Sequence, residues 1–232
     1  MSNKRQLNIV AIIPARGGSK GILKKNITPL NGQPLISYTI KQALKTPQID
    51  KVVVSTDDSE IKSISKKYNA EVIDRPSKIS GDLASSESAI EHVIQELDKQ
   101  NYNVDIIVFL QCTSPLRKPK DISNAINLLI KNEFDSVFSV TENYPFIWLE
   151  KKGKIEPLNP IYQIKRPMRQ ERKPEYIENG SIYVFTKDSF NKSKNRTSGK
   201  KGIYIMPYEH SFEVDSPFDL WLVEQILRRN SL

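Results

Sequence analysis

Apolar residues in the first two-thirds of the chain follow two alternating patterns. Short unbroken apolar runs, such as 105–110, are typical of strands covered on both faces. Between these runs, apolar residues recur at the helical spacing i, i+3, i+4, i+7, as they do in 86–99. The predicted elements are strands at 8–13, 51–55, 72–73, 105–110 and 136–140, and helices at 34–46, 58–68, 86–99 and 121–131. Repeated strand–helix units predict an α/β fold with a mostly parallel sheet and helices on both faces.

The alternation stops at residues 141–177, which are rich in Pro, Lys, Arg and Glu and contain several aromatic residues. We interpret this segment as an insertion that forms a β-ribbon or an irregular excursion, and its aromatic residues suggest a subunit interface. Strand patterns resume at 181–185 and 203–206, and a last helix is predicted from Pro217. The sequence thus predicts one α/β domain, 1–140 plus 178–232, interrupted by the insertion.

A basic, glycine-rich loop follows the first predicted strand. It has the sequence Pro14-Ala-Arg-Gly-Gly-Ser-Lys-Gly21 and is followed by Lys24-Lys25-Asn26. Glycine lets a backbone approach a ligand and point its N–H groups at it. Four cations beside three glycines, at the carboxyl end of a buried strand, indicate a polyphosphate site. The loop matches neither the Walker A nor the dinucleotide fingerprint, and its alternative interpretation is a solvated basic turn.

Two more polar motifs follow predicted strands. Ser55-Thr-Asp-Asp58 ends the second, and Gln111-Cys-Thr-Ser-Pro-Leu-Arg117 follows 105–110. The carboxyl ends of parallel strands meet at one edge of a sheet, where ligands bind, so these motifs should converge on the glycine loop. In the second motif, Gln111 could read a base or sugar edge and Arg117 could pair with an anion. Alternatively, it is a proline-stopped turn whose hydroxyls satisfy backbone groups.

Two carboxylates near the end of the chain could bind a metal. In an extended segment, Glu213 and Asp215 point to the same side, and such a pair can hold Mg²⁺ together with substrate phosphates. The alternative is that Asp215 or Ser216 caps the helix from Pro217, and both interpretations can hold at once.

Composition and charge exclude several classes of protein. The chain has 232 residues, a net charge of +8 and one cysteine, so an intrachain disulfide and a Cys-based zinc site are not expected. The cations are scattered, and no aromatic residue is interleaved with those of the opening loop, which disfavours nucleic-acid binding. The N-terminus superficially resembles a signal peptide, but it leads into the glycine loop rather than a cleavage site. No segment is long enough to span a membrane, and we expect a cytoplasmic protein.

Five motifs, in order along nearly the whole chain, resemble the acylneuraminate cytidylyltransferases, or CMP-sialic acid synthetases. They are the opening loop through Asn26, Ser55-Thr-Asp57, Gln111-x-Thr-Ser-Pro-Leu-Arg117, Glu178-Asn-Gly-x-Ile-Tyr183 and Glu213-Val-Asp-Ser-Pro-x-Asp-Leu220. The resemblance implies a Rossmann-like fold of the nucleotide-diphospho-sugar transferase type, with 141–177 as a dimerisation insertion. It also implies a homodimer that uses CTP, a nine-carbon 2-keto sugar acid and Mg²⁺, or Mn²⁺, to make a CMP-sugar for surface polysaccharide biosynthesis.

The resemblance also assigns roles by motif position. The expected nucleotide-binding residues are Arg16, Gly17, Ser19, Lys20, Lys25, Asn26, Arg75 and Ser86. The expected sugar-acid residues are Gln111, Arg169, Asn179 and Tyr183, and the expected metal ligands are Glu213 and Asp215. Arg16, Lys20 and Gln111 are the expected catalytic residues. Glu213 takes a position that the family usually gives to aspartate. Within the same chemistry, the alternative substrates are legionaminic acid, pseudaminic acid and, more distantly, an eight-carbon ulosonic acid.

Overall fold

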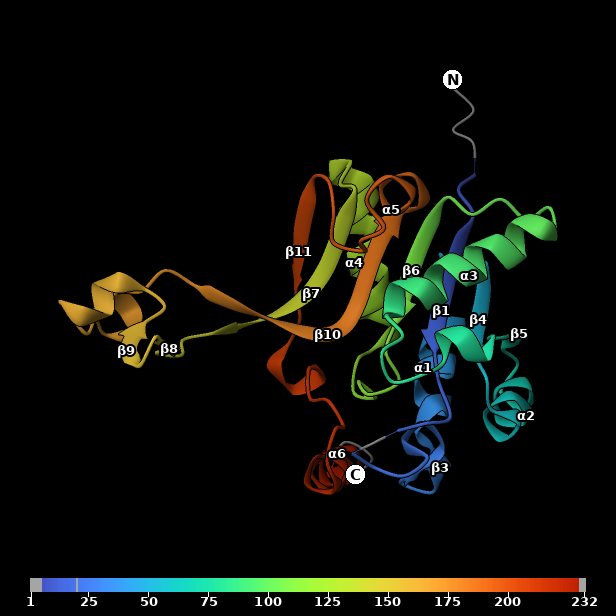
Figure 1. Cartoon of the computed structure of the whole chain (residues 1–232), viewed down its shortest axis with the longest axis horizontal. Coiled ribbons are helices and arrows are strands. Elements are labelled where there is room, and N and C mark those ends of the chain that lie inside the picture. Colours follow the sequence, from blue (N-terminus) through green and yellow to red (C-terminus); the bar gives the residue numbers. More distant parts are fainter. Residues whose placement is uncertain (1–5, 20, 230–232) are drawn as a thin grey trace.

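A computed structural model, which describes residues 6–19 and 21–229, shows an α/β fold built on one seven-stranded sheet (Figure 1). The strand order is β11-β7-β10-β6-β1-β4-β5. Only β10 runs antiparallel to its neighbours, β6 and β7, while every other pair in this sheet is parallel. The strands are β1 (Ile9–Pro14), β4 (Lys51–Thr56), β5 (Glu71–Asp74), β6 (Ile106–Leu110), β7 (Ser136–Asn143), β10 (Glu175–Thr186) and β11 (Lys201–Ile205). The predicted mostly parallel sheet is confirmed.

Helices cover both faces of this sheet, as the unbroken apolar strands predicted. Buried side chains of α1, α2 and α4 pack against one face, and those of α3 and α5 pack against the other. The helices are α1 (Leu35–Leu44), α2 (Ser59–Lys67), α3 (Ser86–Lys99), α4 (Pro119–Asn132), α5 (Lys187–Ser193) and α6 (Pro217–Arg229). α4 begins two residues earlier than predicted, because Pro119 suits the first helical turn.

The last helix lies apart from the two main layers and brings the C-terminal segment to the glycine loop. α6 buries Val223 against the short hairpin β2 (Pro29–Leu30) and β3 (Gln33–Pro34) and the start of α1. The backbone N–H of Val214 donates to the carbonyl of Thr113 at 2.7 Å. These contacts fix the segment that carries Glu213 and Asp215 beside the loop that follows β6.

Residues 141–177 form an arm that projects away from the sheet (Figure 1). At its base, β7 and β10 pair with each other beyond the main sheet, with Asn143 opposite Glu175. The arm also contains the hairpin of β8 (Trp148–Lys151) and β9 (Lys154–Pro157), followed by two short 3-10 helices, Pro160–Gln163 and Arg169–Glu171. Its role in dimerisation stays a prediction. Within the described part of the chain, no helix is both long and apolar enough to cross a membrane.

Candidate active site

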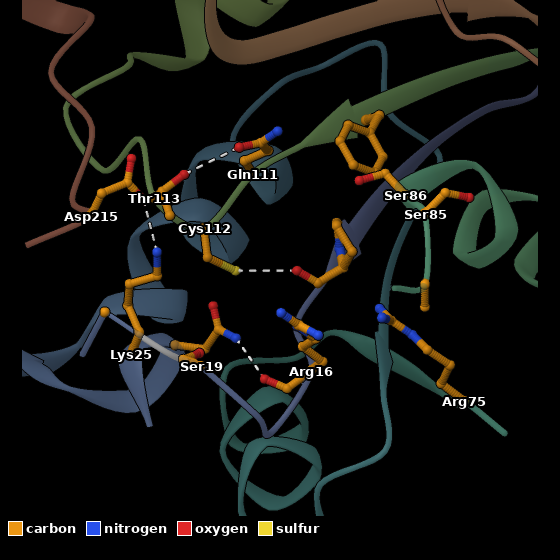
Figure 2. Close-up of a pocket in the computed structure, with 15 residues that line it drawn as sticks. Arg16, Ser19, Lys25, Arg75, Ser85, Ser86, Gln111, Cys112, Thr113 and Asp215 are labelled. Atoms are coloured by element: carbon orange, nitrogen blue, oxygen red, sulfur yellow. Dashed lines mark hydrogen bonds and ion pairs between the residues drawn. The ribbon is translucent and has the colours of Figure 1, made fainter. Parts of the chain in front are cut away.

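Two of the predicted motifs, the glycine loop and the motif that begins at Gln111, meet at a pocket of about 470 Å³ at the carboxyl ends of β1 and β6. Residues 55–58 do not line this pocket. Figure 2 shows Lys25 and Asp215 on the left of this pocket, Ser85, Ser86 and Arg75 on the right, and Arg16 between them. The predicted site residues that line this pocket are Arg16, Ser19, Lys25, Asn26, Arg75, Ser86, Gln111 and Asp215. Lys20 lies outside the described residues.

The glycine loop is held by contacts from three other parts of the chain. Asn26 is buried and donates from Nδ2 to the Arg16 carbonyl at 3.0 Å, while the Gly17 N–H donates to Asp57 Oδ1 at 3.0 Å. A Cβ at Gly21 would lie 2.5 Å from the Asp215 carbonyl oxygen, so only glycine fits there without a backbone shift. The loop and the acidic segment are therefore in direct backbone contact.

Each cation in the described part of the glycine loop and of the segment after it has a defined partner. Arg16 Nη1 donates to the Gly81 carbonyl at 2.9 Å and to Asp82 Oδ1 at 3.0 Å, and Lys25 Nζ pairs with Asp215 Oδ1 at 2.9 Å. Lys24 instead pairs with Glu60 at 2.5 Å. The structure therefore directs Arg16 and Lys25 to the pocket and ties Lys24 to α2.

Ser55 of the motif 55–58 holds Arg75, which lines the pocket. The sequence did not indicate this role. Arg75 is buried, and it donates from Nε to Ser55 Oγ at 3.0 Å and from Nη2 to the Ser55 carbonyl at 2.7 Å. Burial lowers the pKa of Arg75, and the negative charge of Asp57 partly opposes that shift. Asp58 caps α2 by accepting from the N–H groups of Glu60 and Ile61. The only signal in the sequence was the position of this motif at the end of a strand.

The two carboxylates of the acidic segment differ in their surroundings. Glu213 Oε1 is buried and accepts no hydrogen bond from the described part of the chain. Burial, followed by the charge of Asp215, raises the pKa of Glu213 to about 7. A Cβ at Gly180, whose φ is +62°, would collide with this carboxylate. Asp215 is largely exposed and is joined to Lys25. Glu213 thus offers a buried oxygen that accepts no hydrogen bond, and Asp215 offers an exposed carboxylate.

The cap of α6 does not use the Asp215 carboxylate. Ser216 caps the start of α6: its Oγ accepts from Asp219 N–H at 3.3 Å, and Asp219 Oδ2 accepts from Ser216 N–H at 2.8 Å. Asp215 is left to point at Lys25. Across residues 6–19 and 21–229, no group of three or more His, Cys, Asp or Glu side chains could hold a metal ion. A pair of carboxylates still fits Mg²⁺, which usually keeps several waters and binds substrate phosphates.

Arg117 is structural rather than ligand-facing, whereas Cys112 lines the pocket with a side chain that is only 2% exposed. The hypothesis that Arg117 pairs with an anion is wrong, because it is fully buried and donates to neutral oxygens. Its partners are the Ser181 and Gln111 carbonyls at 2.6 and 2.7 Å, and side-chain oxygens of Ser181, Thr39 and Gln42. Burial raises the pKa of the Cys112 thiol to about 12, so it is inert at neutral pH.

The predicted sugar-acid residues are only partly brought together. Gln111 lines the first pocket, and Asn179 lines an adjoining pocket of about 370 Å³ that also contains Glu213 and shares Asp215 with the first. Arg169 instead lies in the arm and lines a third pocket, of about 600 Å³, where it stacks 4.6 Å from the Tyr144 ring centroid. This pocket shares Asn143 and Tyr208 with the pocket of Asn179.

Tyr183 is also held away from these pockets by its own contacts. It is 3% exposed, donates its hydroxyl to Glu178, and packs against Phe109 and Arg196. Burial, with help from Glu178, raises its pKa. Neither Arg169 nor Tyr183 lines the pocket that contains Gln111.

Comparison with known proteins places this geometry in a family. Residues 10–227 match the family described as cytidylyltransferase. The N-acylneuraminate cytidylyltransferase of Oncorhynchus mykiss is 38% identical over 226 residues, which are 96% of this chain and 51% of that protein. The pseudaminic acid cytidylyltransferase of Campylobacter jejuni serotype O:23/36 is 30% identical, over 95% of this chain and 97% of that protein. The chain thus spans about half the length of the vertebrate relatives it matches.

Solved structures support the same fold. CMP:2-keto-3-deoxy-manno-octonic acid synthetase, solved in complex with CTP, superposes with a TM-score of 0.71 at 17% identity, covering 96% of this chain and 99% of that one. A 4-diphosphocytidyl-2C-methyl-D-erythritol synthase also gives 0.71, at 10% identity, covering 95% and 98%. With a family match over most of its length and relatives at 38% identity, this chain belongs to the cytidylyltransferase family.

Proposed function

We propose that this protein transfers CMP from CTP to a nonulosonic acid, giving the CMP-sugar and pyrophosphate. One observation carries the proposal most strongly: the glycine loop, Lys25 and Asp215 meet at a single pocket, with Gly21 directly against the Asp215 backbone. Cations and a carboxylate side by side suit a metal–triphosphate complex. The family and the names of its members supply the base and the sugar class.

The layout of the pocket suggests how CTP would lie. The triphosphate would extend between Arg16 and Lys25, whose cations offset its charge. The nucleoside would extend toward Ser86 and Arg75 at the other side of the pocket (Figure 2). Arg75 is held by Ser55, so it would meet the ligand in a fixed orientation, and a preformed contact loses little entropy on binding.

Glu213 and Asp215 would hold Mg²⁺ or Mn²⁺. The buried Oε1 of Glu213 lacks a donor, and its pKa is raised partly by the Asp215 charge, so a cation between the two carboxylates would relieve both. When bound there, the ion would neutralise charge on the triphosphate. Glutamate in place of the usual aspartate still supplies an oxygen at this position.

The reaction we propose is direct attack of the sugar's anomeric hydroxyl on the α-phosphorus, with pyrophosphate leaving. The protein's part is positioning and charge neutralisation. Arg16 would stabilise the negative charge that builds up on the leaving phosphates. Gln111 would orient the sugar from the loop after β6, where Arg117 fixes its carbonyl. Asn179 lines the neighbouring pocket and would contact the same sugar.

A homodimer would account for the arm. Several of its large apolar side chains are exposed, among them Ile164 at 89% and Met168 at 64%. In a dimer, the arm of one copy could lie over the pocket of the other, which would bring Arg169 to a sugar carboxylate. Light scattering at several protein concentrations tests the dimer. CTP as a substrate agrees with the cytoplasmic location expected from the sequence.

The decisive assay incubates the protein with CTP, Mg²⁺ and a panel of nonulosonic acids, and measures pyrophosphate release. N-acetylneuraminic acid should give turnover that needs both CTP and the divalent ion, while ATP, GTP and UTP should give little. If no acid on the panel releases pyrophosphate above the background without enzyme, the proposal is wrong.

Pseudaminic acid is the second candidate substrate. A pseudaminic acid cytidylyltransferase matches over 97% of its own length, whereas the vertebrate N-acylneuraminate enzymes match over about half of theirs. Legionaminic acid and eight-carbon ulosonic acids belong on the same panel. The acid with the highest kcat/KM identifies the preferred substrate.

A further inference from the structure

One ion pair joins the side of the pocket that we propose for the nucleoside to a distant part of the chain. Arg196, in the connection between α5 and β11, donates from Nη1 to Glu87 Oε1 at 2.8 Å. Glu87 lies in the first turn of α3, next to Ser86, which lines the pocket. Neither Arg196 nor Glu87 lines this pocket, so the pair acts on a ligand there through its neighbours.

The hydrophobic core does not fix the first turn of α3. The buried side chains of this helix begin at Ala89, after the residues that line the pocket. Before the helix, residues 81–83 are exposed, and Leu83 is fully exposed. Ser85 caps the helix by accepting from the Ser88 N–H at 3.1 Å, which is a contact within the turn itself. The ion pair therefore adds a long-range contact to a turn that burial alone does not hold.

Two aromatic rings hold Arg196 in place. Its guanidinium lies 4.5 Å from the ring centroid of Tyr183 and 5.2 Å from that of Phe109. These two residues are directly opposite each other on β10 and β6, and Phe109 also lines the pocket. A guanidinium is planar and stacks on aromatic faces, so its donors point in defined directions. Arg196 therefore connects the sheet to the start of α3.

We propose that Arg196 and Glu87 are a positioning pair, which fixes the first turn of α3 and thereby the contacts of Ser85 and Ser86 with the nucleoside. The inference rests on the proposed function, since it requires a nucleotide whose nucleoside lies at this side of the pocket. It assigns a role to two residues that have no place among the nucleotide, sugar or metal contacts proposed above. A turn that is already in place loses little entropy on binding, so loss of the pair should weaken these contacts.

The position of the pair predicts which part of a ligand it affects. Ser85 and Ser86 lie across the pocket from Lys25, where we place the triphosphate (Figure 2). Loss of the pair should therefore weaken binding of CTP and CMP by a similar factor and leave inorganic tripolyphosphate unaffected. A long-range effect of the Arg196 charge would differ, because electrostatic attraction grows with the charge of the anion. It would weaken binding of tripolyphosphate most.

A second ion pair between the same two segments provides a matched control. Lys194 pairs with Glu91 at 2.7 Å, one turn further along α3. Their side chains are 54% and 41% exposed, whereas those of Arg196 and Glu87 are 19% and 29% exposed. Exposed ion pairs contribute little to stability, and neither Lys194 nor Glu91 is next to a residue that lines the pocket.

The experiment is calorimetric titration of wild type, R196M, E87Q and the double variant with CTP, CMP and tripolyphosphate. Methionine keeps an apolar side chain against the two rings, and glutamine keeps the shape of glutamate. Each single variant should bind CTP and CMP about tenfold more weakly, which lies within the range for residues in contact. The double variant should bind no more weakly than the single variants, and tripolyphosphate should bind as it does to wild type. K194M/E91Q should match wild type with all three ligands.

Steady-state kinetics gives a second readout that a loss of stability alone would not change. In the pyrophosphate assay, R196M and E87Q should raise KM for CTP by about tenfold with little change in kcat, because the contacts affected are made equally in the ground state and the transition state. Circular dichroism of each variant checks the fold. If R196M does not fold, E87Q tests the same bond from the other side.

The outcomes separate this inference from the proposed function. Unchanged affinity for CMP in E87Q, additive losses in the double variant, or an equal loss in K194M/E91Q overturns the positioning role while the proposed function stands. A loss for tripolyphosphate as large as that for CMP also overturns it, because the effect would not be confined to the nucleoside side. If wild type neither binds CTP nor releases pyrophosphate from it, the proposed function fails and this inference falls with it.

Discussion

The pocket and the arm of this molecule each contain a buried arginine, and the two arginines make different contacts. Arg117 lies beneath the pocket, is fully buried, and donates only to neutral oxygens. Arg172 lies in the arm, with its side chain 4% exposed, and stacks against the rings of Tyr144 and Phe146 while pairing with Glu175. Arg117 remains charged at neutral pH, although burial lowers its pKa to about 10.

The difference lies in what each arginine connects. Arg117 joins α1, the loop after β6 and strand β10, which are far apart in the sequence. Arg172 donates to the carbonyls of Tyr144 and Pro145 and to Glu175, all within the arm or at its base. The pocket is therefore tied to the cooperative core of the sheet, whereas the arm is stabilised by its own local contacts.

The largest expected effect is on the pocket side. Arg117→Met should lower the free energy of unfolding by about 3–5 kcal/mol, because several buried oxygens lose their donor at once. Urea unfolding followed by circular dichroism measures this loss. Arg117→Lys, which keeps the charge but not the planar fork, should recover only part of it. A loss below about 1 kcal/mol in the methionine variant would show that these hydrogen bonds contribute little.

The second largest effect is expected on catalytic activity, and it comes from the contact between the glycine loop and the acidic segment. Gly21→Ala places a Cβ 2.5 Å from the Asp215 carbonyl oxygen, so the two backbones must move apart. A displacement of this size should reduce kcat/KM by about 100-fold. Gly18→Ala is the control, because its Cβ would meet no atom within 4 Å. Equal activity of the two variants in the pyrophosphate assay would contradict the contact.

Two glycines with the same backbone strain compare the pocket and the arm directly. Gly180 has φ +62° beside Glu213, and Gly153 has φ +76° in the β8–β9 turn with open space around its missing side chain. Either change to alanine should cost about 1–2 kcal/mol locally. Only Gly180→Ala should also raise the Mg²⁺ concentration needed for half-maximal activity, because it displaces the Glu213 carboxylate. If Gly153→Ala raised the Mg²⁺ concentration needed for half-maximal activity by as much, the effect of Gly180→Ala would not come from Glu213.

The smallest effect should be confined to the arm. Arg172→Met removes the cation between the rings and its bonds to two carbonyls, so local opening of the arm should become easier by about 1–2 kcal/mol. Limited proteolysis should cut within 151–173 faster than in wild type. Affinity for CTP, measured by calorimetry, should stay unchanged. A fall in the unfolding free energy as large as that of Arg117→Met would show that arm and sheet unfold together.

Much of the fold could be predicted because it depends on local periodicity. Strand β1 is an unbroken buried run, and the apolar face of α3 is buried at the predicted positions, so their types and places follow from spacing alone. The convergence of the glycine loop with the loop after β6 also followed, because carboxyl ends of parallel strands share one edge.

What sequence reasoning missed depends on tertiary contacts. Nothing local distinguishes an arginine that binds a ligand from one buried among three segments, so the sequence leaves open both an anion partner and a structural turn at Arg117. Ser55 accepts a hydrogen bond from Arg75, and Asp57 accepts one from the Gly17 N–H. These partners are distant in the sequence, so only the folded structure shows them. Arg169 belongs to the arm and lines a different pocket from Gln111, which the sequence does not reveal. Its role in sugar binding stays a prediction.

A crystal structure of the protein with CTP and Mn²⁺ is the sharpest test of the proposed nucleotide and metal site. We expect a triphosphate in contact with Arg16 and Lys25, and an anomalous manganese signal between that triphosphate and the carboxylates of Glu213 and Asp215. A nucleotide bound elsewhere, or a manganese ion remote from both carboxylates, would contradict it.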